Sequence, residues 1–527
     1  MIIDFRLSQI VTPDEECLDF PHAGITCIVG ANNVGKSRFL RDITSTLLNS
    51  DAQTVTFSEL KTIKPIVDEA IAWRFMEEVG TKSTDPQGHV APRFTPLNGG
   101  QGLTVHEFLR HYRVAGPAVG PAISFFTWYA SAGSLVAAAS GGAGNFAMEG
   151  MSHPLARVFR DGSLEQELSD LAQESFNLPL TLDRINGDVR LRVGSVDIPV
   201  PPLNRPSLEY ANAVRNLPTL DEQGDGIKSF FGLALNVIAG SAQILLIDEP
   251  EAFLHPAQAR TLGRWLRREA ARRNLQVVLA THDKDLLLGL IDSDGDSVVN
   301  IVRITREKGL NRFRQLSHDE ISAVWKDPVL RYSNVLQGLF HGKVVICESD
   351  ADCRFYRAVL DQLAGETSRR SIADDILFVP SGGKRRVASM ATALTRLGVK
   401  TYAIVDFDIL RSRSDVIEVV QGIGRQWTDE MGFEYKSMAR EVNQSQRWNE
   451  LKHQGLAGLP AGSAFVAGDH LVKMLRECSI LVVPVGEMED FDKSSNLHGA
   501  AWVSQMLESR KHESCRDARD LVEAILS

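Results

Sequence analysis

Apolar positions along the chain predict two blocks in which short buried strands alternate with amphipathic helices. In the first block, short apolar runs lie at residues 25–29, 244–247 and 276–280, and helical patterns cover residues 38–48 and 256–274. Continuous short apolar runs are typical of strands that are buried on both faces. Strands separated by helices favour a parallel sheet, in which ligands bind beyond the carboxyl ends of the strands.

A second block of the same kind occupies the C-terminal part of the chain. Its helical patterns cover residues 352–363 and 387–397. Its apolar runs lie at residues 343–347, 376–380, 401–405 and 479–485. This alternation predicts a second α/β domain that is built on its own parallel sheet.

Two long stretches interrupt the blocks. Residues 48–207 carry mixed helical and strand signals, including a strand pair that turns at Asn186-Gly187, and residues 415–475 have a mostly helical pattern. We interpret both stretches as insertions, the first of them a candidate for dimerisation. We expect a first domain over residues 1–310, a connector over residues 311–341 and a second domain over residues 342–527.

Composition places the chain among soluble globular proteins, because 24% of its residues are charged and 43% are hydrophobic. The formal net charge of -10 excludes broad nonspecific attraction to nucleic acid but leaves room for a local basic groove. Six cysteines without a CxxC pair are typical of reduced thiols. The N-terminus lacks a signal-peptide pattern, so we expect a cytoplasmic protein.

One stretch without charged residues, between Arg113 and Glu149, has the length of a membrane span. Glycine, serine and proline residues interrupt it. We therefore expect a buried strand at residues 122–129, followed by a flexible loop, and no contact with a membrane.

The glycine-rich loop after the first apolar run is the clearest motif in the chain. Residues 30–37 are Gly-Ala-Asn-Asn-Val-Gly-Lys-Ser, so G-x-x-x-x-G-K-S spacing stands between a predicted strand and a predicted helix. In this context, backbone N–H groups and the helix N-terminus bind nucleotide phosphates. Lys36 would reach the β- and γ-phosphates of ATP, and Ser37 would hold Mg²⁺. We expect nucleotide contacts from Gly30, Asn32, Asn33, Gly35, Lys36 and Ser37.

Polar residues also follow the other two apolar runs of the first block. Asp248 and Glu249 come directly after the run at residues 244–247, and His282 lies just beyond the run at residues 276–280. Because parallel strands end at one edge of a sheet, we expect these side chains to lie near the phosphates. Asp248 would hold Mg²⁺, Glu249 would activate the attacking water and His282 would contact the γ-phosphate.

Together these motifs resemble an ABC-type ATPase of the RecF, SMC and OLD kind. Residues 223–229 (Gln-Gly-Asp-Gly-Ile-Lys-Ser) resemble the signature loop of that superfamily, and residues 248–256 (Asp-Glu-Pro-Glu-Ala-Phe-Leu-His-Pro) are similar to the OLD-like form. In the superfamily, the signature loop of one subunit closes on nucleotide bound by another, so the resemblance implies a homodimer or a larger oligomer. It also implies nucleotide contacts from Gly224, Gly226, Lys228 and Ser229. Gln87 and Gln101 are the candidates for the Q-loop glutamine.

Carboxylates follow three apolar runs of the second block, and alternation along a strand would point the pair Asp406 and Asp408 to one side. Six carboxylates at strand ends would repel one another unless divalent cations neutralised them. Oxygen ligands select Mg²⁺ or Mn²⁺, and two such ions support phosphodiester cleavage. The candidate ligands are Glu348, Asp352, Asp406, Asp408, Glu487 and Glu489. The alternative is that these acids are solvated loop residues.

The second block resembles a Toprim domain, whose motif is a strand-ending Glu, an Asp four residues later and a later Asp-x-Asp. Ser349 stands where the family has a glycine. The residues that match the motif are Glu348, Asp352, Asp406 and Asp408, and the late acidic pair of OLD-type nucleases corresponds to Glu487 and Glu489. An ABC-type ATPase followed by a Toprim domain is the layout of the OLD family. Its members are ATP-associated nucleases, several of them bacterial anti-phage effectors.

Basic residues near these acids are candidates for contacts with a nucleic-acid backbone, which position the substrate without identifying its sequence. Lys384, directly after Gly382-Gly383, is the strongest of them, and we assign it to the catalytic site. The others are Arg385, Arg386, Arg411 and Arg413. Solvated surface charge is the alternative for each of them.

The leading hypothesis is an ATP-regulated, metal-dependent endonuclease that cleaves DNA, which we expect to be double-stranded. Nucleotide state would control access to the Toprim acids. One alternative is a RecF- or SMC-like ATP-dependent DNA-binding clamp whose acids do not cut. A second alternative is a Toprim nuclease that cuts RNA. The family resemblance further implies anti-phage defence and leaves room for a regulator, protein or RNA, from a neighbouring gene.

Overall fold

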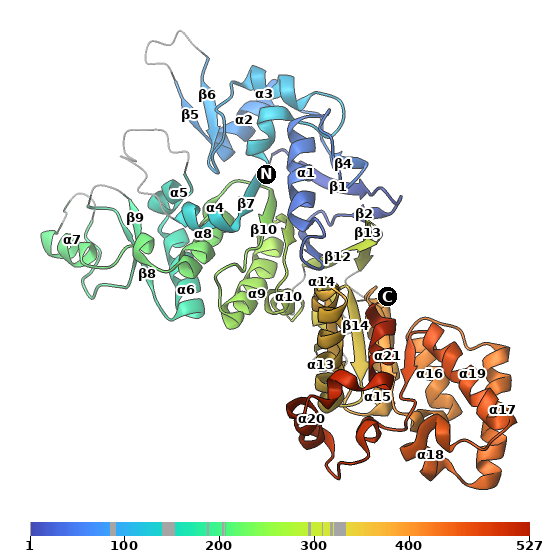
Figure 1. Ribbon diagram of the computed structural model, residues 1–527. Helices are drawn as coiled ribbons and strands as arrows, with labels where there is room; N and C mark the ends of the chain where they lie inside the picture. Colours follow the sequence, from blue (N-terminus) through green and yellow to red (C-terminus); the bar gives the residue numbers. More distant parts are fainter. Residues whose placement is uncertain are drawn as a thin grey trace. The chain divides into compact units, whose positions relative to one another are not determined.

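The computed structural model describes residues 2–84, 91–139, 153–186, 189–202, 205, 207–292, 297–307, 309–316, 320 and 334–526. The chain forms two compact units, Met1–His318 and Asp319–Ser527 (Figure 1). Both units are α/β with parallel strands, so the predicted fold class is confirmed. Gln87, Gly187 and much of the expected connector lie outside the described residues.

A six-stranded sheet forms the centre of the N-terminal unit, in the order β13-β12-β3-β11-β10-β7. All neighbouring strands are parallel except β13, which is antiparallel to β12. Asp248 pairs in register with Ala280, and Ala280 pairs with Ile28, so three strands end at the same edge. The strands are β3 (Gly24–Val29), β7 (Thr127–Ser131), β10 (Ile244–Asp248), β11 (Gln276–Ala280), β12 (Val298–Glu307) and β13 (Leu310–Leu316).

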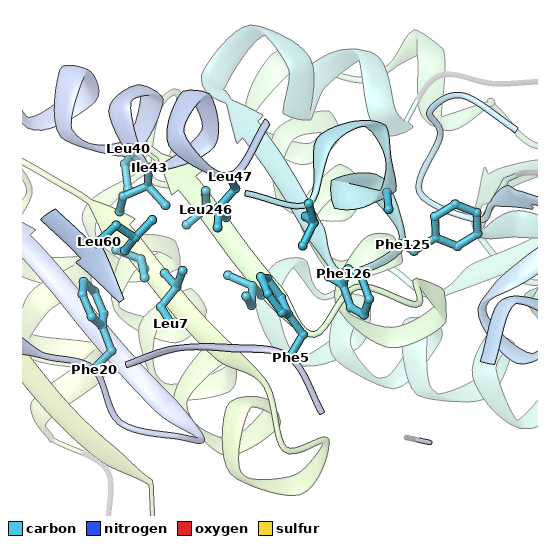
Figure 2. Packing of buried hydrophobic residues seen from close by; sticks show 14 of the residues in the cluster. Phe5, Leu7, Phe20, Leu40, Ile43, Leu47, Leu60, Phe125, Phe126 and Leu246 are labelled. Carbon is cyan, nitrogen blue, oxygen red and sulfur yellow. The ribbon is translucent and has the colours of Figure 1, made fainter. Parts of the chain in front are cut away.

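Helix α1 (Lys36–Leu48) lies between this sheet and a three-stranded antiparallel sheet of β2 (Cys17–Asp19), β1 (Arg6–Val11) and β4 (Glu59–Ile63). Its apolar positions recur every three or four residues, which places them on one face of the helix. Figure 2 shows Leu40, Ile43 and Leu47 from α1 in one cluster with Leu7, Leu60 and Leu246. This packing holds the first turn of α1, and with it the glycine loop, against the sheet.

The stretch 48–207 contributes to the core sheet, although we expected an insertion. Strand β7 pairs in parallel with β10 and forms the sheet edge. The expected flexible loop after β7 is wrong for residues 132–139, which form helix α4 (Ala132–Ala139). Helix α4 packs closely on α8 (Asp225–Ala239) at Gly232. A Cβ placed at Gly232 would lie 1.9 Å from the carbonyl oxygen of Leu135, so the two helices can approach this closely only with glycine there.

Further elements surround this core. The helices are α2 (Glu69–Val79), α3 (Val105–Tyr112), α5 (Leu155–Arg160), α6 (Gly162–Phe176), α7 (Leu208–Arg215), α9 (Pro256–Arg272) and α10 (Lys284–Ile291), with 3-10 segments η1 (Gly120–Phe125) and η2 (Leu220–Glu222). Two antiparallel hairpins join β5 (Gly80–Ser83) to β6 (Arg93–Pro96) and β8 (Leu180–Asp183) to β9 (Arg190–Val193).

The C-terminal unit is built on a four-stranded sheet in the order β15-β14-β16-β17, with every pair parallel. Val345, Tyr402 and Ile404 join one buried cluster with apolar residues of the helices α13 (Asp350–Glu366), α20 (Gly499–Glu508) and α21 (Arg516–Leu526). Strand β17 is shorter than the predicted run at residues 479–485, because the chain leaves the sheet after Val483, whose N–H donates to the carbonyl oxygen of Val405. The carbonyl oxygen of Pro484 instead accepts from the N–H of Leu456. The strands are β14 (Lys343–Cys347), β15 (Ile376–Pro380), β16 (Lys400–Val405) and β17 (Ile480–Val482).

Helices make up the rest of this unit, and four of them, α16 to α19, cover the predicted helical insertion. The helices are α13 (Asp350–Glu366), α14 (Arg370–Asp374), α15 (Lys384–Arg396), α16 (Arg413–Gly422), α17 (Asp429–Ser445), α18 (Trp448–Gln454), α19 (Ser463–Glu477), α20 (Gly499–Glu508) and α21 (Arg516–Leu526). The 3-10 segments are η3 (Asn334–Phe340), η4 (Phe407–Arg411), η5 (Gly455–Gly458), η6 (Met488–Asp492) and η7 (Lys511–Ser514). Among the described helices of both units, none is long and apolar enough to cross a membrane.

Candidate functional site

The glycine loop connects β3 directly to α1, as the motif predicts. Gly30 and Gly35 have φ values of 149° and 101°, which favour glycine, and a Cβ at Gly30 would lie 2.3 Å from the carbonyl oxygen of Ile304. The Lys36 ammonium group donates to the carbonyl oxygens of Gly30 and Ala31, at 2.9 Å each. Burial lowers the pKa of Lys36. The loop therefore wraps around a lysine whose charge is poorly solvated and available to a phosphate.

Ser37 and Asp248 meet at this loop. The Ser37 hydroxyl donates to the Asp248 carboxylate at 3.0 Å, which joins the first turn of α1 to the end of β10. Burial raises the pKa of Asp248, and the nearby Glu249 carboxylate raises it further. A hydroxyl beside a carboxylate is an oxygen donor set that suits Mg²⁺ next to nucleotide phosphates.

Glu249 and His282 lie next to each other beyond the ends of β10 and β11. Glu249 has a left-handed backbone conformation with φ of 55°, and its N–H donates to the carbonyl oxygen of Ala280. The Nδ1 atom of His282 is 3.3 Å from Oε1 of Glu249 and 3.5 Å from Oε1 of Glu251. Sequence reasoning missed Glu251 as a member of this group.

The predicted signature loop lies at the start of α8, where Gly224 is the N-cap residue. Gly226 is packed tightly, since a Cβ there would lie 2.5 Å from the carbonyl oxygen of Phe253. Lys228 pairs with Asp225 at 2.8 Å. The Ser229 side chain is fully buried in its own unit, which is not where a contact to nucleotide on another subunit is expected. Of the two Q-loop candidates, Gln101 is exposed in a loop and Gln87 lies outside the described residues.

The predicted acids of the C-terminal unit converge at the carboxyl edge of its sheet. Glu348 follows β14, Asp352 lies in the first turn of α13, and Asp406 follows β16. The N–H of Asp406 donates to Oε1 of Glu348 at 3.3 Å. Burial, together with the nearby charges of Asp408 and Asp352, raises the pKa of Glu348 to about 7. These acids are therefore neighbours that repel one another, not solvated loop residues.

The late acidic pair reaches the same centre. Burial raises the pKa of Asp406 well above its usual range, and nearby carboxylates, Glu487 among them, add to the shift. Burial and the charge of Glu489 raise the pKa of Asp352. Each of the six carboxylates is therefore within electrostatic reach of at least one other, and carboxylate oxygens are hard ligands that fit Mg²⁺ or Mn²⁺.

The strand-alternation argument for Asp406 and Asp408 is wrong, although both residues reach the centre. After Val405 the chain turns into η4, so neither residue lies on a strand. The N–H of the buried Phe407 donates to the carbonyl oxygen of Gly486 at 2.8 Å. Burial of Phe407 and this hydrogen bond set the turn that places both carboxylates.

Lysine and histidine side chains pair with the outer acids of this centre. Lys384, the first residue of α15, contacts Asp408 at 2.8 Å, as its assignment to the site requires. Glu487 pairs with Lys452 at 3.2 Å and with His453 at 3.0 Å. The other predicted basic residues, Arg385, Arg386, Arg411 and Arg413, are exposed.

Sequence reasoning missed Lys452 and His453, which belong to α18 in the helical insertion. No motif marks them in the sequence. Contacts with the loop before Glu487 place α18: the N–H of Leu456 donates to the carbonyl oxygen of Pro484 at 2.9 Å, and a Cβ at Gly486 would lie 2.4 Å from the carbonyl oxygen of Lys452.

The raised pKa values predict how pH affects the stability of the metal-free protein. Glu348, Asp352 and Asp406 hold their protons to higher pH in the folded state than in the unfolded state, where carboxyl groups have pKa values of about 4. The contribution of these three acids to folding stability therefore falls as pH rises from about 4 through about 7. We expect the gain in Tm on adding Mn²⁺ to be larger at about pH 8 than at about pH 5.5, as measured by calorimetry against an EDTA sample. An equal gain at both pH values would contradict a metal site made of these acids.

Two family models match the chain. The model described as "AAA domain, putative AbiEii toxin, Type IV TA system" matches residues 133–289, which contain Asp248, Glu249 and His282. The model described as "Overcoming lysogenization defect protein-like, TOPRIM domain" matches residues 339–408, which contain Glu348 and Asp406. No curated protein matches the chain.

Several solved structures are similar to the chain at low identity. The SMC head domain from Thermotoga maritima is 13% identical, with 60% of this chain and 100% of that chain covered and a TM-score of 0.30. The Smc head domain with an extended coiled coil bound to the C-terminal domain of ScpA, derived from Pyrococcus furiosus, is 12% identical, with 62% and 98% covered and a TM-score of 0.32. The structure of cbiO1 from Clostridium perfringens, part of the ABC transporter complex cbiONQ, is 12% identical, with 62% and 94% covered and a TM-score of 0.29.

The two matches follow one another along the chain, the ATPase model first and the TOPRIM model second. That order is the one expected from the glycine loop at residues 30–37 and the acids from Glu348 onward. The chain therefore has the architecture of the OLD (overcoming lysogenization defect) family, an AAA ATPase domain followed by an OLD-like TOPRIM domain.

Proposed function

We propose that this protein is an ATP-binding and ATP-hydrolysing endonuclease that cleaves DNA phosphodiester bonds with divalent metal ions. The observation that carries the proposal is the convergence of six carboxylates, three of them with raised pKa values, at one edge of a parallel sheet. Carboxylates this close are stable as anions when cations neutralise them. The AAA ATPase and OLD-like TOPRIM matches support an ATP-dependent nuclease.

Side chains of the C-terminal unit have separate tasks in this proposal. Bound Mg²⁺ or Mn²⁺ would supply an activated water and stabilise the leaving oxygen. Glu348, Asp352 and Asp406, which are mostly buried, hold the ions at the sheet edge. Lys384 fixes Asp408 through its 2.8 Å ion pair and presents a positive charge to the substrate phosphate. The exposed side chains that contact the DNA backbone would be Arg385, Arg386, Arg411 and Arg413.

The N-terminal unit would control this reaction. ATP would bind at the loop from Gly30 to Ser37, with Mg²⁺ between Ser37 and Asp248, and Glu249 would activate the hydrolytic water. We propose that the N-terminal unit forms a homodimer or a larger oligomer and that its nucleotide state gates access of double-stranded DNA to the acids. The protein would act in anti-phage defence in the cytoplasm, controlled by a regulator from a neighbouring gene.

A plasmid assay tests the proposal. Purified protein is incubated with supercoiled plasmid and Mg²⁺ or Mn²⁺, with and without ATP, beside Glu348→Gln and Asp406→Asn variants. Cutting by the wild type and none by the variants supports the metal site. Single-stranded DNA and RNA are offered in parallel, because cutting of RNA alone would replace the proposed substrate class. Binding of plasmid without any cutting would favour the DNA-binding clamp.

Lys452 gives a further prediction about metal affinity. Its ammonium group occupies one side of the Glu487 carboxylate, so it repels a dication that approaches Glu487. We expect Lys452→Met to lower the Mn²⁺ concentration for half-maximal cutting by about 3-fold to 10-fold. Lys473→Met is the matched control, because Lys473 pairs with Asp469 on α19 of the same insertion. An unchanged or higher Mn²⁺ requirement for Lys452→Met would show that this ion pair does not oppose metal binding.

A further inference from the structure

Glu251 is a buried acid that the proposed steps of ATP hydrolysis do not use. It lies three residues after Asp248 in the turn that follows β10, and its side chain is only 4% exposed. Its charge reaches Lys36 in the glycine loop. The side chain of Glu251 is therefore enclosed between the glycine loop and the end of β11.

One oxygen of Glu251 organises the segment after β11. Oε1 accepts a hydrogen bond from the Thr281 hydroxyl at 2.7 Å and another from the N–H of His282 at 3.2 Å. The same Thr281 hydroxyl accepts from the N–H of Asp283 at 3.0 Å. Asp283 in turn caps helix α10 through the N–H of Leu286. The backbone around His282 is thus tied to the turn after β10 through a single carboxylate oxygen.

The second carboxyl oxygen of Glu251 does not contribute to folding stability. Oε2 is buried and has no hydrogen-bond partner among the described residues. An unpaired buried polar atom costs about 1–3 kcal/mol. An apolar side chain would avoid that cost, and the protein nevertheless has a carboxyl group here. Burial raises the pKa of Glu251 to about 7, which reflects the same desolvation.

Glu251 also differs in mobility from the two groups that it faces. The side chains of Glu249 and His282 are 42% and 48% exposed, and exposed side chains of this length sample several rotamers. His282 Nδ1 stands between Oε1 of Glu249 at 3.3 Å and Oε1 of Glu251 at 3.5 Å. The buried carboxyl group is the fixed member of the three.

We propose that Glu251 is the positioning residue of the ATPase centre. It holds the Thr281–His282 backbone with one oxygen and orients the His282 imidazole towards Glu249 and the site of the γ-phosphate. This inference rests on the proposed hydrolysis of ATP and assigns Glu251 no contact with the nucleotide. It acts through His282.

A double-mutant cycle tests this dependence. We expect Glu251→Ala to lower kcat of ATP hydrolysis about 10-fold or more, with the Kd for ATP changed by less than about 2-fold. Glu251→Gln keeps the accepting oxygen and should stay within about 3-fold of the wild type. In a His282→Ala background, Glu251→Ala should cause no further loss. Additive losses would overturn the proposal, as would equal losses of ATP binding and kcat.

Glu269→Ala controls for the removal of a buried acid from the same unit. The side chain of Glu269 on α9 is 5% exposed and pairs with Arg272 on the same helix and with Arg273 directly after it. We expect this variant to lower Tm while leaving kcat at temperatures below Tm near the wild-type value. A similar loss of kcat in Glu269→Ala and Glu251→Ala would assign Glu251 a structural role only.

A spectroscopic measurement separates failure of this inference from failure of the proposed function. In protein labelled at histidine, the imidazole signal that disappears in His282→Ala reports the position of His282 without any turnover. We expect this signal to shift in Glu251→Ala and to return towards its wild-type position in Glu251→Gln. If the wild type binds ATP without hydrolysing it and the signal still shifts in Glu251→Ala, the proposed hydrolysis is refuted and the positioning role stands. An unchanged signal in Glu251→Ala refutes the positioning role itself.

Discussion

Asp406→Asn is expected to reduce metal-dependent cleavage by at least about 1000-fold. Burial raises the pKa of Asp406 well above its usual range, and the charges of Glu348, Asp352, Asp408 and Glu487 all reach it. Asparagine has nearly the same volume but carries no charge, so it weakens the field that binds two dications and leaves the shape of the centre intact. The rate of plasmid nicking in Mn²⁺ measures the loss, and calorimetric titration with Mn²⁺ measures the affinity.

Asp350→Asn is the matched control for this prediction. Asp350 lies on α13 beside Asp352, but its side chain is 64% exposed and pairs with Arg354 at 2.7 Å. We expect this variant to cut at nearly the wild-type rate, because an exposed ion pair of this kind contributes about 0–1 kcal/mol. Asp406→Asn should also be at least as stable as the wild type without metal, since it removes one of the repelling charges. Cutting that survives Asp406→Asn would falsify the metal-site assignment.

Lys36→Ala is expected to weaken ATP binding by about 100-fold or more. Alanine cannot form the one or two charge-assisted hydrogen bonds that Lys36 would donate to phosphate, and each of these contributes about 1.5–3 kcal/mol to binding. Lys36 is 7% exposed, and its ammonium group donates to the carbonyl oxygens of Gly30 and Ala31, so the loop already holds the charge that a phosphate would contact. Titration with ATP measures the affinity, and the plasmid assay measures whether the response of cutting to ATP disappears.

Lys64→Ala is a close control, because Lys64 is also partly buried and donates to the carbonyl oxygens of Val114 and Ala118 at 2.8 and 3.0 Å. Both variants lose a lysine that is bonded to backbone carbonyl groups. We expect only Lys36→Ala to lose ATP. If Lys36→Ala abolishes ATP binding and cutting still responds to ATP as in the wild type, the gating proposal is wrong.

The sequence by itself predicted the four strands of the second sheet and most strands of the first. It did not predict β12 and β13, which lie in and next to the stretch that we expected to be a connector. Continuous apolar runs predicted buried parallel strands, and the carboxyl ends of those strands carry the glycine loop, Asp248, His282, Glu348 and Asp406. Such predictions succeed because the period of a buried strand and the direction of a parallel sheet are local properties. A residue at the end of a strand then reaches the site wherever the rest of the chain lies.

Tertiary structure alone decided which distant segments complete each site. Lys452 and His453 reach Glu487 because residues 452–456 pack against the loop at residues 484–486, and nothing in the local pattern around α18 indicates that contact. Strand β7 likewise joins the core sheet from within a stretch whose mixed pattern predicted an insertion.

The burial of Glu251 likewise could not be predicted from the motif in which it lies. Its position in the Asp-Glu-Pro-Glu sequence resembles that of the exposed Glu249, and only the fold buries it against Thr281. Burial and partners depend on the packing of residues far apart in the chain, and these contacts also set the pKa values of the acids. The sequence therefore determined the strands and the residues at their ends, and packing decided which of those residues became charged, buried or paired.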